Sequence, residues 1–251
     1  MRSYSSVFAL MARTTLLRCA GITCAMAALE SGFFFCMMEK QSPAMGLEEI
    51  LEHWFFYYIV NLGFFIITEL VASPFSLKGS NCFYTLKRLP ATRRQITAAC
   101  SLYSLCILLS VIAIQTLLFF AFCKISEFRY QSSAGIHTAF LAFIRCPLIM
   151  SILPVFQPLS ILRNILALTC ISLTAGTSVT LQNKNWAVSA LPVLLIFWLR
   201  ETSYSLLFIG ILGYTLCLVF LIFRLFRKTE EDDDFEEKNS VDTVPGGENY
   251  A

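Results

Sequence analysis

Long apolar runs dominate this sequence and leave it few ways to fold outside a lipid bilayer. Apolar residues make up 57% of the chain, whereas charged residues make up only 14%. A soluble domain is nearer half apolar and a quarter charged, so a soluble chain could not cover the surplus. A helix that crosses the hydrocarbon core needs roughly 20 mostly apolar residues. The composition therefore predicts an all-α, polytopic integral membrane protein in a lipid bilayer.

Six apolar segments are long enough to be interpreted as membrane-spanning helices. They lie near residues 16–38, 54–75, 96–123, 136–156, 161–181 and 204–223. The third segment would reach about 42 Å as a helix, so we expect it to tilt or to extend into the cytoplasm. The mixed polarity of residues 5–17 predicts a short helix at the inner interface, before the chain turns into the bilayer.

A shorter apolar stretch, residues 186–199, decides the number of crossings. With Pro192 in its middle, it would rise only about 21 Å as a helix, short of the ~30 Å hydrocarbon core. We therefore expect a short re-entrant helix on the outer side, with an idle interfacial helix as the alternative.

The positions of the charges agree with six crossings. The N-terminal segment, the 76–95 segment and the end of the last span are basic, whereas the 39–52 segment is acidic. Cytoplasmic loops carry the excess of Lys and Arg. This bias predicts cytoplasmic N- and C-termini and therefore an even number of spans.

The chain divides into a basic membrane domain, residues 1–228, and an acidic tail, residues 229–251. The tail carries nine acidic residues against the single Lys238. Such a composition predicts a disordered cytoplasmic segment, which either keeps the end solvated or docks on a partner.

Enzyme signatures are missing from the sequence. It has no G-x-x-x-x-G-K-[ST] loop, no H-E-x-x-H motif and no G-x-S-x-G elbow. Glu48-Glu49 resembles the paired glutamates of CAAX-type intramembrane proteases, but no later helix offers the matching histidine motif. The ten cysteines include no C-x-x-C pair, and nearly all lie in or beside apolar runs. We expect no catalytic residue, no metal, no directly bound cofactor and no nucleic-acid partner.

Three charged residues fall inside predicted spans, namely Glu30, Glu69 and Arg145. Charges within a bilayer are costly, and each is therefore a candidate for function. They could line a polar translocation path or form a charge pair that changes between conformational states. Alternatively, they could join helices, with Glu30 or Glu69 neutralised by Arg145.

The strongest local pattern lies in the basic 76–95 segment. Phe83, Leu86 and Leu89 recur every three residues, which places them on one side of a short helix. Pro90 cannot continue that helix and suits the first turn of the next one, so we expect a corner between Leu89 and Pro90. The pattern predicts a basic, two-part hook in the cytoplasm.

The run from Tyr84 to Ile96, Y-T-L-K-R-L-P-A-T-R-R-Q-I, resembles the T-L-x-R-L-P-x-[ST]-R-R segment of small ABC-2-type permeases of bacterial ABC exporters. The length, the six predicted spans and the short element before the last span are also similar to that family. The resemblance covers about a dozen residues in motif and residues 1–228 in architecture.

The resemblance implies a plasma-membrane permease that pairs with a second copy or a paralogue and with a separately encoded ATPase. ATP would act only through that ATPase, to drive efflux of an amphipathic, peptide, drug or lipid-like substrate. The residues that it implies for the ATPase contact are Phe83, Tyr84, Leu86, Lys87, Arg88 and Leu89, with Arg93 and Arg94 at their base. A non-transporting accessory or sensory protein that binds a cytoplasmic partner through the basic loop remains the alternative.

Overall fold

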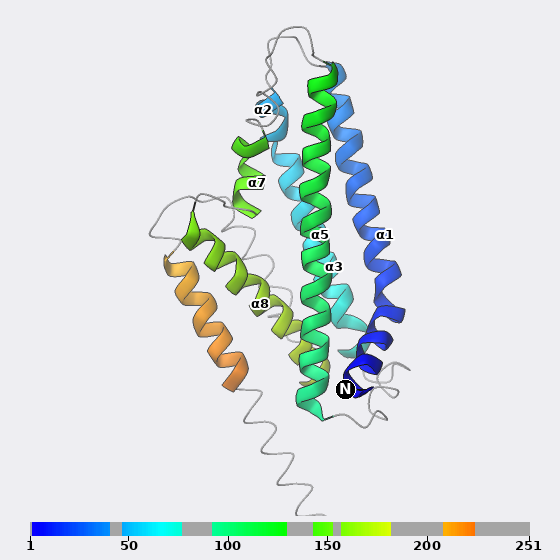
Figure 1. Ribbon diagram of the computed structural model, residues 1–251, viewed down its shortest axis with the longest axis vertical. Helices are drawn as coiled ribbons and strands as arrows, with labels where there is room; N and C mark the ends of the chain where they lie inside the picture. Colours follow the sequence, from blue (N-terminus) through cyan, green and yellow to red (C-terminus); the bar gives the residue numbers. More distant parts are fainter. Residues whose placement is uncertain are drawn as a thin grey trace, which may run out of the picture.

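The computed structural model describes residues 2–40, 47–76, 92–129, 143–152, 157–181 and 208–223 (Figure 1). Within these ranges the chain is helical apart from a few connecting residues, and no strand occurs in them. The helices are α1 (Arg2–Lys40), α2 (Leu47–Leu51), α3 (Trp54–Ser76), α5 (Arg93–Arg129), α7 (Pro147–Ile152), α8 (Pro158–Leu181) and a last helix, Phe208–Phe223. Four of them, α1, α3, α5 and α8, are long and apolar enough to cross a membrane. The described residues thus confirm the predicted all-α fold, with four helices that could span a membrane.

The two longest helices, α1 and α5, lie side by side and run in the same direction (Figure 1). Near their starts, the rings of Phe8 and Tyr103 meet edge to face with their centroids 5.1 Å apart. Farther along, Phe34 stacks on Phe122 at 4.4 Å. In these two pairs the residue numbers increase along both helices, so α1 and α5 are parallel. The helix between them in the sequence, α3, returns antiparallel to α1.

The direction of α8 differs from the expectation. The backbone of Gly176, near the end of α8, lies against Thr97 and Ser101, near the start of α5. Leu108, farther along α5, packs instead in one cluster with Ile171. α8 is therefore antiparallel to α5, whereas a fifth crossing in the predicted order would run parallel to it.

The last helix is parallel to α8. The Cys170 thiol donates to the carbonyl of Tyr214 at 3.2 Å, and Leu221 lines one groove with Thr177. Leu181 thus ends α8 near the start of α5, whereas Phe208 lies beside the first turns of α8. The chain between these two residues joins opposite ends of α8. The predicted re-entrant helix, 186–199, lies outside the described residues.

The predicted span at 136–156 is described only over residues 143–152, and there it is broken. Cys146 is not helical, and α7 starts directly after it with Pro147. Proline has no backbone N–H to continue a preceding helix, and it suits a first helical position. The described part is therefore not the unbroken helix that the hydropathy predicted.

The predicted turn after an interfacial helix at 5–17 is wrong, because α1 is one continuous helix from Arg2 to Lys40. Val7, Met11 and Thr15 follow one another at four-residue spacing, and all three are buried. They extend the stripe of α1 that faces α5, so packing against α5 keeps this segment in the helix. Its 39 residues reach about 58 Å, well beyond the hydrocarbon core.

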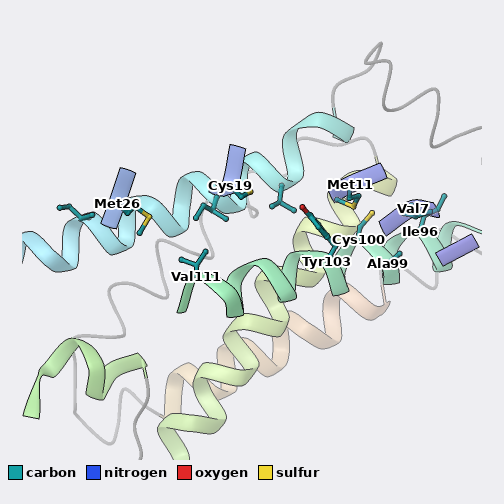
Figure 2. Close-up of a cluster of buried hydrophobic side chains, with 12 residues drawn as sticks. Val7, Met11, Cys19, Met26, Ile96, Ala99, Cys100, Tyr103 and Val111 are labelled. Carbon is teal, nitrogen blue, oxygen red and sulfur yellow. The ribbon is translucent and has the colours of Figure 1, made fainter. Parts of the chain in front are cut away.

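Two clusters of buried side chains fill the space between α1, α3 and α5. One lies toward the starts of α1 and α5 and holds aliphatic and sulfur-containing side chains such as Met11, Cys19 and Ile96 (Figure 2). The other lies toward their far ends and is rich in aromatic rings, Phe34 and Phe122 among them. The bundle therefore has chemically different halves.

Candidate functional site

The start of α5 adjoins the segment that carries the family resemblance. The Thr92 backbone N–H donates to Gln95 Oε1 at 3.2 Å, and the Gln95 N–H donates to Thr92 Oγ1 at 3.4 Å. This reciprocal pair is a capping box, which satisfies two of the backbone donors at a helix start. α5 thus begins at Arg93, three residues after Pro90, and the predicted corner between Leu89 and Pro90 lies outside the described residues. The T-x-x-Q spacing was readable from the sequence and was overlooked.

Three helix ends meet at this point. Arg94 is exposed at the start of α5 and lines a half-open groove. The other residues that line the groove come from α5, α8 and the last helix: Thr97, Ala98, Leu173, Thr177, Leu221 and Ile222. The start of α5 and the last turns of α8 and of the last helix therefore share one end of the bundle. The start of α1 lies at the same end, because Val7 and Ile96 pack in one cluster.

Most of the predicted ATPase-contact residues lie outside the described part of the chain, namely Phe83, Tyr84, Leu86, Lys87, Arg88 and Leu89. Of the two predicted base residues, Arg93 is the first residue of α5, and Arg94 follows it. Of the predicted ATPase-contact residues, the structure therefore describes only Arg93 and Arg94, which lie at the shared end of the bundle.

Glu30 lies at the centre of the α1–α5 contact. It is 12 residues after Arg18 and nine before Glu39, or about 18 and 14 Å along the helix axis. Its side chain has no exposed area, nor has that of Gln115 on α5. The Glu30 carboxyl interacts with the Gln115 amide. However, none of the four polar atoms of the two side chains has a partner that meets full hydrogen-bond geometry.

This polar pair lies between the two core clusters. One turn before it, Met26 and Val111 belong to the aliphatic cluster. One turn after it, Phe34 and Phe119 belong to the aromatic cluster. Glu30 and Gln115 thus form a polar layer between the two core clusters.

The predicted neutralisation by Arg145 is wrong for Glu30 and does not fit the position of Glu69. The side chain that acts on Glu30 is Gln115. Arg145 is exposed and precedes Cys146, whose thiol lies 4.0 Å from the carbonyl of Leu51, close to the start of α3. Glu69 is half-buried, and it lies some four turns, about 22 Å, after the start of α3. The three charged candidates therefore form no common site.

A buried arginine was missed in the sequence. Only 5% of Arg163 is exposed, and its Nε and Nη2 donate to Asn164 Oδ1 at 3.2 and 3.0 Å. Asn164 Nδ2 in turn donates to the carbonyl of Ser151 at 2.7 Å, which ties α8 to α7. Arg163 lies within the predicted fifth span, so the rule that selected Glu30 would also have found it.

The described residues hold no group of three His, Cys, Asp or Glu side chains that could bind a metal ion. Their nine cysteines are free thiols. His53 lies at the start of α3, where its Nδ1 accepts a hydrogen bond from the Phe55 N–H at 3.3 Å. This histidine therefore acts as a helix cap.

Comparison of the chain with protein-family models, curated proteins and solved structures found no match. Its function therefore has to be inferred from its own helices, their ends and the buried polar residues.

Proposed function

We propose that this chain is the membrane-spanning permease subunit of an ABC exporter. The observation that carries the proposal is the shared end of the bundle, where the start of α5 lies beside the last turns of α8 and of the last helix. The basic run of residues 84–94 leads directly into this end. A force applied there reaches several helices at once, as a coupling contact requires.

The proposed topology has six crossings with both termini in the cytoplasm. α1, α3, α5, α8 and the last helix supply five of them, although the last is the shortest, at 16 residues. The chain between Leu181 and Phe208 joins opposite ends of α8, and it supplies the remaining crossing. The end that carries Arg94 is the cytoplasmic one under the positive-inside bias. This order keeps the predicted even number of spans. It gives up the predicted crossing at 136–156, and it makes residues 182–207 a crossing in place of the re-entrant helix predicted at 186–199.

The mechanism that we propose is transmission along α5. A separately encoded ATPase binds the basic hook, with Lys87 and Arg88 as its charged contacts, and ATP-driven closure of the ATPase pair pulls on the start of α5. That helix has 37 residues, about 55 Å, and contacts α1, α3 and α8. Two permease copies, or this chain and a paralogue, would then move against one another in the plasma membrane. The cargo is an amphipathic, peptide, drug or lipid-like molecule.

Charge reversal of the hook tests the proposal. The tagged protein is purified in mild detergent, and the P-loop ATPase that co-purifies is assayed. The double variant Lys87→Glu, Arg88→Glu should lose ATPase binding and transport yet insert normally. A matched control reverses Lys40 and Arg129, the last residues of α1 and α5 at the other end of the bundle. The proposal fails if no ATPase co-purifies with the wild type, or if both double variants behave alike.

The alternative, a non-transporting accessory or sensory protein, predicts a different result. The hook variant would then lose a cytoplasmic partner that has no ATPase activity. Substrate efflux would be unchanged.

A further inference from the structure

Glu30 is the one fully buried acidic side chain among the residues that the structure describes. The side chain that acts on its carboxyl is Gln115, on the adjacent helix α5. Both side chains are completely shielded, and their four polar atoms lack full hydrogen bonds. Buried polar groups are normally paired, so each exception calls for a chemical explanation.

The buried residues of α3 at the level of this pair are apolar. α3 runs antiparallel to α1, and Met26 lies against Gly63. This register brings the buried Ile59 and Val60 to the level of Glu30.

The charged groups of these helices lie at other levels. Along α1, Arg18 and Glu39 are each at least about 14 Å from Glu30, and Glu69 is about 15 Å farther along α3 than Ile59. On α5, Arg94 and Lys124 lie about 31 and 14 Å from Gln115. Accordingly, no charged group of the described residues acts on the Glu30 carboxyl.

The chemistry of the pair distinguishes two protonation states. A carboxylate accepts hydrogen bonds only, so it could use the Gln115 N–H but would face the Gln115 carbonyl as a second acceptor. A neutral carboxylic acid donates its O–H to that carbonyl and accepts the N–H in return. The acid form therefore joins the two side chains by two reciprocal hydrogen bonds, and it places no unpaired charge between the helices.

We propose that Glu30 is a proton-binding site. As a neutral acid it pairs with the Gln115 amide and holds α1 against α5. When the two helices part and water enters, Glu30 gives its proton to water and becomes a carboxylate. When they close, it takes a proton back. The position of the α1–α5 seam is thereby linked to proton uptake, which goes beyond the proposed function and does not depend on it.

Infrared spectroscopy of the full-length protein in lipid vesicles at neutral pH tests the protonation state. The wild type should show the C=O band of a protonated carboxyl, and Glu30→Gln should lose it. The control Glu69→Gln should keep it, because Glu69 is only half-buried on α3. In Gln115→Leu the band should move to higher frequency, since the carbonyl loses its N–H donor. A wild type without the band, a band that survives Glu30→Gln, or a band that stays in place in Gln115→Leu would each overturn the proposal.

Thermal unfolding gives a second readout. Glu30→Gln should keep the melting temperature of the wild type at neutral pH, because its amide offers an N–H donor and a carbonyl acceptor in the same places. Glu30→Ala should melt several degrees lower, since Gln115 is left buried without a partner. Raising the pH should destabilise the wild type relative to Glu30→Gln. Equal losses in Glu30→Gln and Glu30→Ala, or stabilisation by Na⁺ that requires Glu30, would contradict a proton site; the Na⁺ result would indicate a metal-cation site.

Discussion

The two faces of α5 differ in how they hold their neighbours. Toward α1, the contact is made by long side chains, with Phe122 stacked on Phe34 and Gln115 beside Glu30. Toward α8, the contact near the start of α5 is made by small residues. A Cβ placed on Gly176 would collide with Ser101 Oγ and would lie 2.8 Å from the carbonyl of Thr97.

The difference indicates which pair of helices moves as a unit. Small residues let two backbones approach closely, and in a bilayer this packing is a main source of helix association. The hydroxyls of Thr174, Thr177 and Ser178 donate to carbonyls of α8 itself, three residues back, so they need no water. We therefore interpret α5 and α8 as a tight pair, and the α1–α5 seam as the contact that is able to open.

The largest expected effect is on the α1 side. Phe34→Ala should lower the free energy of unfolding by about 3–5 kcal/mol, because it removes a fully buried ring from the stack on Phe122. Thermal or denaturant unfolding in detergent measures it. The neighbouring Phe35 is 45% exposed, and Phe35→Ala is the matched control, which should cost much less. Equal losses for the two variants would mean that the stack does not hold this seam.

The next effect concerns the α8 side. Gly176→Ala should cost about 1–3 kcal/mol, because the carbonyl of Thr97 cannot move out of the way without separating the two helices. Gly213, on the last helix, has open space where its Cβ would lie. Gly213→Ala should therefore be neutral, or stabilising by up to about 1 kcal/mol through helix propensity. The free energies of unfolding of both variants are measured in the same detergent. If Gly176→Ala is as stable as Gly213→Ala, the close packing of α5 on α8 is contradicted.

The smallest effect tests one hydrogen bond of the α1–α5 seam. Thr15 Oγ1 donates to the carbonyl of Met11 at 2.9 Å and lies 2.8 Å from Tyr103 Oη, so Tyr103 is the donor between the helices. Tyr103→Phe should cost about 0.5–1.5 kcal/mol. Thr15→Ser should cost less, since it keeps the acceptor. In a double-mutant cycle, Tyr103→Phe and Thr15→Val should couple; strict additivity would show that the bond contributes nothing.

Much of the helical content was predictable because hydropathy reports it directly. The predicted span at 54–75 is α3, Trp54–Ser76, and the one at 161–181 is α8, Pro158–Leu181. The direction of α8 was not predictable in this way, because hydropathy is the same in both directions and the loop charges report only the ends. The break at Cys146 was readable from Pro147, but the apolar character of the 136–156 segment as a whole concealed it.

The candidate site was predictable only in part. Glu30 stood out as a charge inside an apolar run, whereas Gln115 is an uncharged polar residue inside another. Their pairing depends on the register of two helices 85 residues apart in the sequence, which no local pattern encodes. Arg163 could have been found by the rule that selected Glu30, namely that a charged residue inside a predicted span is a candidate for function.

The central structural claim is that the start of α5 and the end of the last helix lie at one end of the bundle. Spin-label distances test it most directly, in the full chain freed of its ten cysteines. One variant carries Arg94→Cys with Ile222→Cys, and the other carries Arg94→Cys with Phe208→Cys. The account predicts that the 94–222 distance is the shorter, by up to about 20 Å, because 14 helical residues separate the two second sites. A 94–208 distance that is equal or shorter would contradict it.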